Sequence, residues 1–288
     1  MKKRITAFVL CIAMCLTLSV TAYADIGPKA SVQITFTGIE GETYYGTLLS
    51  QQRSTGPSTA WDGNPEYAHY DRGDGGRAIW EKFVAYEDED GFYFLQEWWD
   101  CTESNALRWT YRPPSVYKIL LYFPESDSFL VSPIYEQYAF DSYYTVDLSD
   151  LSAPLSAQRS YDYTWELISL AARIVLTILL ELAVALAFGF REKRLVAFIA
   201  AANVVTQVIL NVALNLVNYY SGSLAFTLSY VLFELIVFAV EAVVFAVLFQ
   251  NFSEQAYKRG KIVGYAFVAN ALSFGLGLWL SHLIPGIF

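Results

Sequence analysis

The chain has 288 residues and a formal net charge of −9, and its charged and apolar residues are distributed unevenly. Residues 25–164 carry 22 Asp and Glu against 9 Lys and Arg, whereas residues 165–288 carry 6 against 7 within long apolar runs. A nucleic-acid partner is therefore not expected, because the acidic half would repel a phosphate backbone.

The first 24 residues have the three parts of a secretory signal peptide. A basic start at residues 2–4 precedes an apolar run over residues 5–20, and Ala22-Tyr23-Ala24 supplies the small residues of a cleavage site. We therefore expect residues 1–24 to be removed and Asp25 to begin the mature chain. An uncleaved membrane anchor is the alternative.

Cysteines are few. Cys11 and Cys15 fall within the predicted signal peptide, which leaves Cys101 as the single thiol of the mature chain. A lipoprotein attachment at Cys15 is disfavoured, because Met14 stands where a small residue is required. No intramolecular disulfide or cysteine-based metal cluster is expected in the mature chain. With only two histidines in the sequence, Cys101 is interpreted as a passive thiol and not as a nucleophile.

Residues 25–148 show the two-residue apolar period of strands, which predicts an all-β, sandwich-like extracytoplasmic domain of six to eight short strands. Turn sequences follow the first strand, precede the third and separate the fourth from the fifth, which favours hairpins there. Residues 51–76 have no period and are predicted to form a long exposed loop. The clearest strands are expected at Ser31–Thr37, Glu42–Leu49, Phe92–Trp99, Val116–Phe123, Ser128–Ser132 and Tyr143–Leu148.

Two features of this domain have competing interpretations. Its five tryptophans could form an exposed sugar-binding face, but cross-strand packing is the favoured interpretation. The acidic stretch Asp88-Glu89-Asp90-Gly91 resembles a calcium loop, yet it lacks the further ligands of that motif. An acidic turn is therefore favoured, and no metal or cofactor is predicted.

Residues 149–164, which include Pro154 and several Ser and Ala, are predicted to be a linker to the membrane. Beyond it, residues 165–288 are predicted to form an α-helical transmembrane bundle in a lipid bilayer. At 1.5 Å per residue, each of its apolar segments is long enough to cross a hydrocarbon core of about 30 Å. The four segments are residues 165–190, 195–219, 224–250 and 262–283.

The distribution of basic residues predicts the orientation of the bundle. Arg191-Glu192-Lys193-Arg194 lies between the first two segments, and Lys258, Arg259 and Lys261 lie between the last two, whereas residues 220–223 carry no charge. Because basic turns remain cytoplasmic, the N-terminal domain and the C-terminus are expected on the extracytoplasmic side of the cell membrane. The predicted signal peptide independently requires the same orientation.

The two helical hairpins share a pattern, which predicts two parallel repeats. Glu181 and Glu241 lie nine residues before the ends of the first and third segments, and Asn203 and Asn270 lie nine residues after the two basic turns. At 1.5 Å per residue, all four should lie about 13 to 15 Å from the cytoplasmic boundary.

Polar groups at that depth are costly in lipid, so they should face one another or a wet cavity. The second segment carries amides and a hydroxyl on one face, and the third carries two glutamates seven residues apart. Gly275 and Gly277 would allow close helix approach beside them. The predicted polar seam consists of Glu181, Asn203, Gln207, Asn211, Glu234, Glu241 and Asn270.

Two functions are consistent with this organisation. The first is a non-enzymatic integral membrane protein of the bacterial envelope, a receptor or accessory subunit that binds an extracellular ligand, a second membrane subunit or another copy of itself. The second is a small transporter or a proton- or cation-conducting bundle that uses the seam. Alternatively, the seam amides only hydrogen-bond the glutamates and hold the helices together. No enzyme is predicted, because a hydrolase with paired glutamates would need a metal or an activating histidine, and His282 lies at the outer end.

The helical half contains the motifs Ala-Ala-Asn-Val-Val-Thr-Gln, Glu-Leu-Ile-Val-Phe-Ala-Val-Glu-Ala and Val-Ala-Asn-Ala-Leu-Ser-Phe-Gly. In these it resembles small Gram-positive bacterial membrane proteins of unknown activity, in which an exported N-terminal part precedes a four-helix membrane domain. The resemblance implies the topology and the pairing of helices, but it implies no activity.

Overall fold

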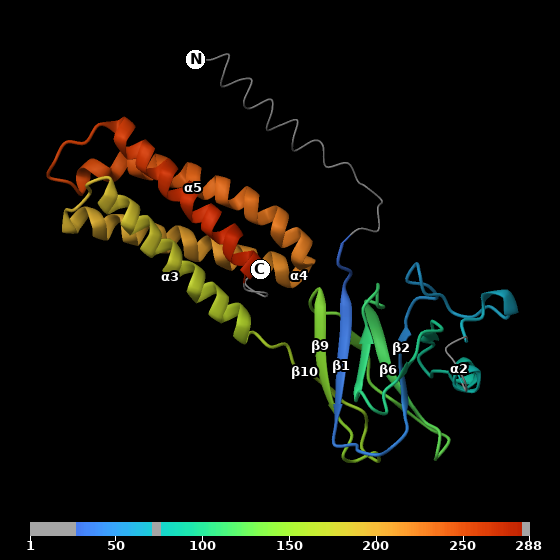
Figure 1. The fold of residues 1–288 in the computed structure, drawn as a ribbon. Helices are drawn as coiled ribbons and strands as arrows, with labels where there is room; N and C mark the ends of the chain where they lie inside the picture. The colour runs from blue at the N-terminus through green and yellow to red at the C-terminus, as the bar shows by residue number, and fades with distance from the viewer. Residues whose placement is uncertain (1–26, 71–75, 284–288) are drawn as a thin grey trace.

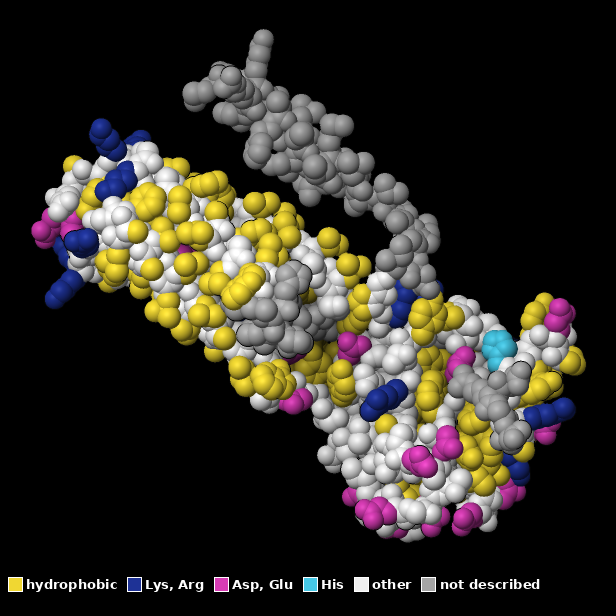
Figure 2. All heavy atoms as spheres, viewed as in Figure 1, with side chains coloured by type: hydrophobic (Ala, Val, Ile, Leu, Met, Phe, Trp, Pro, Cys, Tyr) yellow, Lys and Arg dark blue, Asp and Glu magenta, His cyan; other side chains and the backbone are white. Residues whose placement is uncertain are grey.

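The computed structural model describes residues 27–70 and 76–283, which form a β-rich N-terminal region followed by a helical bundle (Figure 1). The predicted signal peptide lies outside the described residues. Hydrophobic side chains cover the visible face of the bundle, whereas acidic side chains gather on the β region (Figure 2). The uneven composition of the sequence is therefore reflected in two structurally different parts.

In the part of the chain that the structure describes, ten strands form two sheets. The first has the order β10 (Ala157–Arg159), β9 (Asp141–Asp147), β1 (Ser31–Thr37) and β5 (Ala106–Trp109), with β1 parallel to β9. The second has the order β3 (Tyr93–Phe94), β2 (Tyr45–Ser50), β6 (Val116–Phe123) and β7 (Ser128–Val131). Two further strands join this second sheet, β4 (Trp99–Asp100) on β2 and β8 (Tyr135–Glu136) on β6.

Strand β6 is buried on both faces. Ile119 and Leu121 point into a core that also contains Ile34 of β1, so the two sheets pack face to face as a sandwich. Leu120 and Tyr122 point to the opposite face, where helix α2 (Gly76–Ala85) covers the second sheet. Burial on both faces explains why the β6 sequence is almost continuously apolar.

Helix α2 corrects the prediction of an all-β domain. It places Trp80 and Phe83 in the core against the outer face of the second sheet, three residues apart and therefore on one side of a helix. The ten-residue segment follows a Gly-rich stretch, so its helical period was too short to stand out. The predicted loop at residues 51–76 also contains the short 3-10 helix η1 (Pro65–Tyr67).

Two further predictions about strands were wrong in part. The turn after β1 does not close a hairpin, because β1 and β2 belong to different sheets and the turn crosses between them. The expected strand Phe92–Trp99 is split into β3 and β4, with Gln96 at a positive φ of 63° between them. By contrast, the hairpin of β6 and β7 is confirmed by their antiparallel pairing.

The predicted linker is largely part of the β region. Strand β10 pairs with β9, and Leu155 is buried in the core between the sheets. The β region therefore extends to Arg159, and only a few residues separate it from the first long helix. β10 is only three residues long and lies in a Ser- and Ala-rich stretch, which is why the sequence did not predict it.

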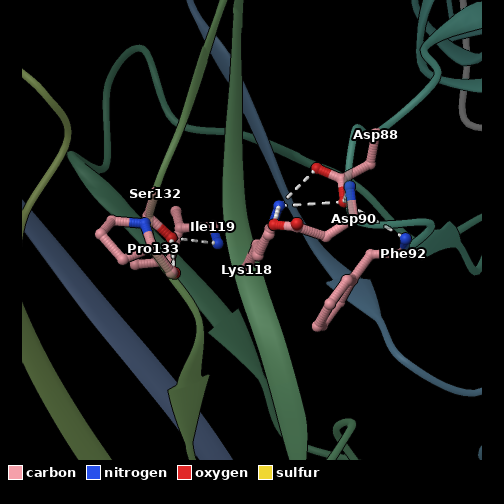
Figure 3. Close-up of polar contacts among 7 residues, drawn as sticks. All are labelled: Asp88, Asp90, Phe92, Lys118, Ile119, Ser132 and Pro133. Carbon is pink, nitrogen blue, oxygen red and sulfur yellow. Dashed lines mark hydrogen bonds and ion pairs between the residues drawn. The ribbon is translucent and has the colours of Figure 1, made fainter.

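An ion cluster stabilises the second sheet beside α2 (Figure 3). Because successive strand residues alternate between faces, Lys118 points into the apolar layer under α2, and its side chain is only 6% exposed. Its ammonium contacts Asp88 at 2.8 Å and Asp90 at 2.6 Å. Burial disfavours the charged ammonium, but the hydrogen bonds to Asp88 and Asp90 outweigh it and raise the pKa of Lys118.

The structure bears on the acidic stretch and on the tryptophans of the β region, each of which has two competing interpretations. Asp88 also accepts the backbone N–H groups of Asp90 and Phe92, so the acidic stretch is a turn closed by Lys118. Among the described residues, no group of three or more His, Cys, Asp or Glu is arranged to hold a metal. The five tryptophans are buried or half-buried, so they do not form an exposed aromatic row.

The bundle contains three helices that are long and apolar enough to cross a membrane. Helix α4 departs from helical geometry at Gly222, where φ is 79° and ψ is 178°. Its two halves lie side by side, because Thr206 hydrogen-bonds Glu241, 35 residues later; on a straight helix these residues would be about 50 Å apart. The helices are α3 (Thr164–Ala187), α4 (Lys193–Leu248, continued by the 3-10 turn η2, Phe249–Asn251) and α5 (Arg259–Leu283).

The turn of α4 at Gly222 rests on the β region. A β-carbon at Gly222 would lie 2.6 Å from the Phe140 ring, and the Phe140 N–H donates to the Tyr219 carbonyl at 2.8 Å. Gly222 is thus required both by its positive φ and by this close approach. The rings that surround Tyr219 are those of Tyr138, Tyr161, Tyr163 and Tyr220.

We predict that Lys118→Met lowers the free energy of unfolding by about 3 to 5 kcal/mol, because Asp88 would remain buried without its partner. Because the pKa of Lys118 is raised, the contribution is present below pH 10.5 and is lost as pH rises through the folded-state value. Urea unfolding of the full-length protein, followed by tryptophan fluorescence, measures the change. Lys82→Met is the matched control, since it breaks the exposed pair with Asp127 and should lower the free energy of unfolding far less. Equal losses in the two variants would contradict the prediction.

Candidate functional site

The predicted polar seam lies inside the helical bundle. Its seven residues are at most 9% exposed, whereas apolar neighbours such as Ile209 (65%) and Leu235 (61%) face outward. An apolar exterior around a polar interior is what a lipid environment favours. The structure gathers these residues into two sets along the bundle, and it adds Thr206, Arg173 and Tyr230 to them.

The first set, the Glu181–Glu241 set, contains Glu181, Asn203, Thr206, Glu241 and Asn270. The Asn270 amide donates to Glu241 Oε2 at 2.8 Å and to the Ala266 carbonyl at 3.0 Å, so both of its hydrogens have acceptors. Thr206 lies 2.5 Å from Glu241 Oε1. Glu241 therefore connects α5 with the first half of α4.

The surroundings of Thr206 indicate where a proton is held. Its single hydroxyl hydrogen has three oxygens within reach, on Ala202 at 3.1 Å, Asn203 at 3.2 Å and Glu241 at 2.5 Å. The hydroxyl can donate to Glu241 Oε1, or it can donate to a backbone carbonyl and accept a proton held on the Glu241 carboxyl group. A protonated Glu241 satisfies every member of this network, and it removes an isolated charge from the bundle interior.

Glu181 lies on α3 in the first hairpin, and its carboxyl group has no well-formed hydrogen bond. Both of its oxygens and the Asn203 side-chain oxygen are buried without one in the part of the chain that the structure describes. The Asn203 amide makes a weak hydrogen-bond contact with the Glu181 carboxyl group, but its well-formed hydrogen bond is to the Ile199 carbonyl at 3.0 Å. A proton on Glu181 would supply a donor for the Asn203 oxygen.

The second set, the Arg173–Glu234 set, contains Arg173, Gln207, Asn211, Tyr230 and Glu234. The Arg173 guanidinium donates to Asn211 Oδ1 at 3.4 Å, lies 5.4 Å from the centre of the Phe226 ring and interacts with Glu234. These residues line a cavity with about 20 Å³ available to water centres, which is room for one water molecule. Sequence reasoning missed Arg173, although a lone arginine within the apolar run 165–190 is itself a signal.

The two sets lie at different depths. Arg173 and Glu181 are eight residues apart on α3, and Glu234 and Glu241 are seven apart on α4, so the sets are about 10 to 12 Å apart along the bundle. Of the three carboxyl groups in the bundle interior, that of Glu234 thus interacts with the Arg173 guanidinium, and the other two lie about two helical turns further along. Such an arrangement can store protons, and passing them between the two sets requires a chain of water molecules or movement of the carboxyl side chains.

The predicted roles of the two glycines differ. A β-carbon on Gly277 would lie 2.3 Å from the Tyr230 hydroxyl oxygen, so this glycine permits α5 to approach the second half of α4. A β-carbon on Gly275 would meet nothing within 4 Å. Gly277 therefore shapes the Arg173–Glu234 set, and Gly275 does not.

Comparison of the chain with protein-family models, with curated proteins and with solved structures finds no match. The function is therefore argued from the geometry of these two sets.

We predict that Gly277→Ala lowers the thermal unfolding midpoint of the detergent-solubilised protein by several degrees, because it displaces the Tyr230 hydroxyl. Gly275→Ala, the matched control, should leave the midpoint unchanged. Adding Tyr230→Phe to Gly277→Ala removes the oxygen that clashes and should restore most of the loss. A Gly277→Ala midpoint equal to that of Gly275→Ala would contradict the predicted close approach.

Proposed function

We propose that this chain is a four-span membrane protein of the bacterial envelope whose helical bundle binds and relays protons. In this proposal the two halves of α4 cross the membrane separately, the signal peptide exports the β region, and Phe288 lies on the same side. The distribution of charge supports this orientation, since Lys and Arg gather at the end of the bundle remote from the β region (Figure 2). The kinship with small Gram-positive membrane proteins stays a prediction.

The proposed orientation can be tested by cysteine labelling in intact cells. Burial, followed by the negative charge of Asp100, raises the pKa of the Cys101 thiol to about 12, so it should not react with a maleimide at neutral pH. Ser223→Cys at the turn of α4 is expected to react with a membrane-impermeant maleimide. Lys258→Cys at the basic end is expected to react only after the cells are opened. The opposite pattern would contradict the orientation.

The proposed internal repeat is supported by local geometry. Asn203 and Asn270 each donate to the carbonyl four residues earlier, at 3.0 Å in both cases. Each follows a basic turn and lies beside the glutamate of its own hairpin, Glu181 or Glu241. The same position in two repeats thus contains a glutamate and an amide, but only Glu241 is fully hydrogen-bonded.

The observation that carries the proposal is the buried Glu181 carboxyl group, whose oxygens have no well-formed hydrogen bond and only a weak contact with the Asn203 amide. A seam that only held the helices together would be expected to satisfy all its buried groups, because an unpaired one costs about 1 to 3 kcal/mol. Glu181 is instead suited to accept and release a proton next to the proton-holding Glu241 network. A proton also needs no shell of several ligands, unlike a metal ion.

A proton moving between the sets has a plausible chemical route. Glu234 borders the cavity that has room for one water molecule, and Glu241 lies about 10 Å further along α4. This distance exceeds the span of about 5.5 Å that one bridging water can cover, so transfer requires a chain of water molecules or movement of the carboxyl side chains. Arg173 would keep Glu234 ionised when the proton moves on, whereas Glu181 and Glu241 would exchange a proton across the bundle.

We predict that Glu181→Gln and Glu241→Gln each reduce proton flux into proteoliposomes by at least about tenfold, because glutamine cannot carry a proton. Flux is measured with an enclosed pH-sensitive dye under an imposed pH gradient. Glu254→Gln, at an exposed position of the basic end, is the matched control and should not alter flux.

Protein yield and thermal midpoint separate a relay from a packing role. The relay is excluded if the wild-type protein carries no proton flux. If Glu241→Gln then also lowers the yield and the thermal midpoint, the polar seam serves packing. Wild-type flux that survives in both glutamine variants would also contradict the proposal.

The receptor or accessory-subunit hypothesis remains the second candidate. One observation favours it, a pocket on the β region that is separate from both polar sets.

A further inference from the structure

The β region contains a surface pocket between three segments. Its walls come from the chain after β2, from the end of α2 and the acidic turn, and from β3. About 490 Å³ is available in it to water centres, a size suited to a small ligand. The lining residues used below are Arg53, Trp61, Tyr86, Glu87 and Tyr93.

Three half-buried aromatic rings form the walls of this pocket. The Trp61 indole N–H donates to the Asn64 carbonyl at 3.3 Å, and the Tyr86 ring contacts the Phe129 ring at a centroid distance of 4.9 Å. Tyr93 belongs to β3, and the Arg53 guanidinium lies 5.1 Å from its ring centre. These contacts hold the rings in place, which lowers the entropy cost of binding a ligand.

Two charged side chains at the rim are available to a ligand. Arg53 and Glu87 are exposed, and no ion pair involves either of them among the described residues. Asp88, in contrast, is already bound by Lys118. The pocket therefore offers hydrogen-bond donors on Arg53, acceptors on Glu87 and a local charge close to balanced.

We infer that this pocket binds a neutral saccharide. The aliphatic C–H face of a pyranose ring packs on aromatic rings such as those of Trp61 and Tyr93, while its hydroxyl groups both donate and accept hydrogen bonds, which suits Glu87 and Arg53. An anionic sugar is disfavoured by the excess of 22 acidic over 9 basic residues in residues 25–164. The inference concerns the exported region and does not depend on the proton relay.

Isothermal titration of the full-length protein in detergent tests this inference with five neutral oligosaccharides, namely maltohexaose, cellohexaose, mannohexaose, xylohexaose and chitohexaose. At least one of them should bind at up to millimolar concentration. Tyr93→Ala should weaken that binding by about tenfold, through loss of ring packing. Arg53→Gln and Glu87→Gln should each weaken it as well, and they change only exposed side chains.

The chain provides a matched control at a second arginine–tyrosine pair. Arg112 lies 6.0 Å from the ring centre of Tyr111 outside the pocket, so Arg112→Gln should bind the oligosaccharide as the wild type does. Near-ultraviolet circular dichroism checks that each variant is folded. Failure of all five sugars to bind, or binding unchanged by Arg53→Gln and Glu87→Gln, would overturn the inference. Binding of polygalacturonate or of free amino acids in place of neutral sugars would overturn it too.

Discussion

The bundle depends on one constraint, which is that its polar side chains must find partners inside because its exterior is apolar. Glu241 meets this constraint by contacting Thr206 on the first half of α4 and Asn270 on α5. These contacts require α4 to fold back on itself, and Gly222 supplies the backbone conformation for that turn. The hydrogen bonds of one carboxyl group therefore tie together the first half of α4, its second half and α5.

The same turn joins the bundle to the β region. Gly222 leaves room for the Phe140 ring, and the Phe140 N–H donates to the Tyr219 carbonyl. Further tyrosine rings pack around Tyr219. Within the β region, the central strand β6 is buried on both faces, so the sheet needs α2 as a second cover. Lys118 is the one charged residue of β6, and its burial explains why two aspartates of the acidic turn are held beside it.

Glu181 and Glu241, which the proposed repeat places at matching positions, differ in their hydrogen bonding. Glu241 is satisfied by neighbouring side chains, whereas Glu181 is buried with no well-formed hydrogen bond to either oxygen. A purely structural seam accounts for the first and not for the second. The proposed proton relay would account for both, because one carboxyl group would hold its proton in a network and the other could change its state. The saccharide pocket lies in the other half of the chain, so the two proposed activities stand on separate residues.

The sequence by itself determined what is local or periodic. Strands β1 and β6 and the apolar helices follow from the spacing of apolar residues, and Glu181 and Glu241 stand out because a charge within an apolar run is rare. Only the tertiary structure decided which groups meet, because side-chain contacts depend on how helices rotate and pack. Asn270 reaches Glu241, Asn203 makes only a weak contact with Glu181, and Arg173 joins Asn211. The sequence did not predict β10 and α2 for the same reason. Both are short, and each is stabilised by the element that it contacts, which is β9 for β10 and the second sheet for α2.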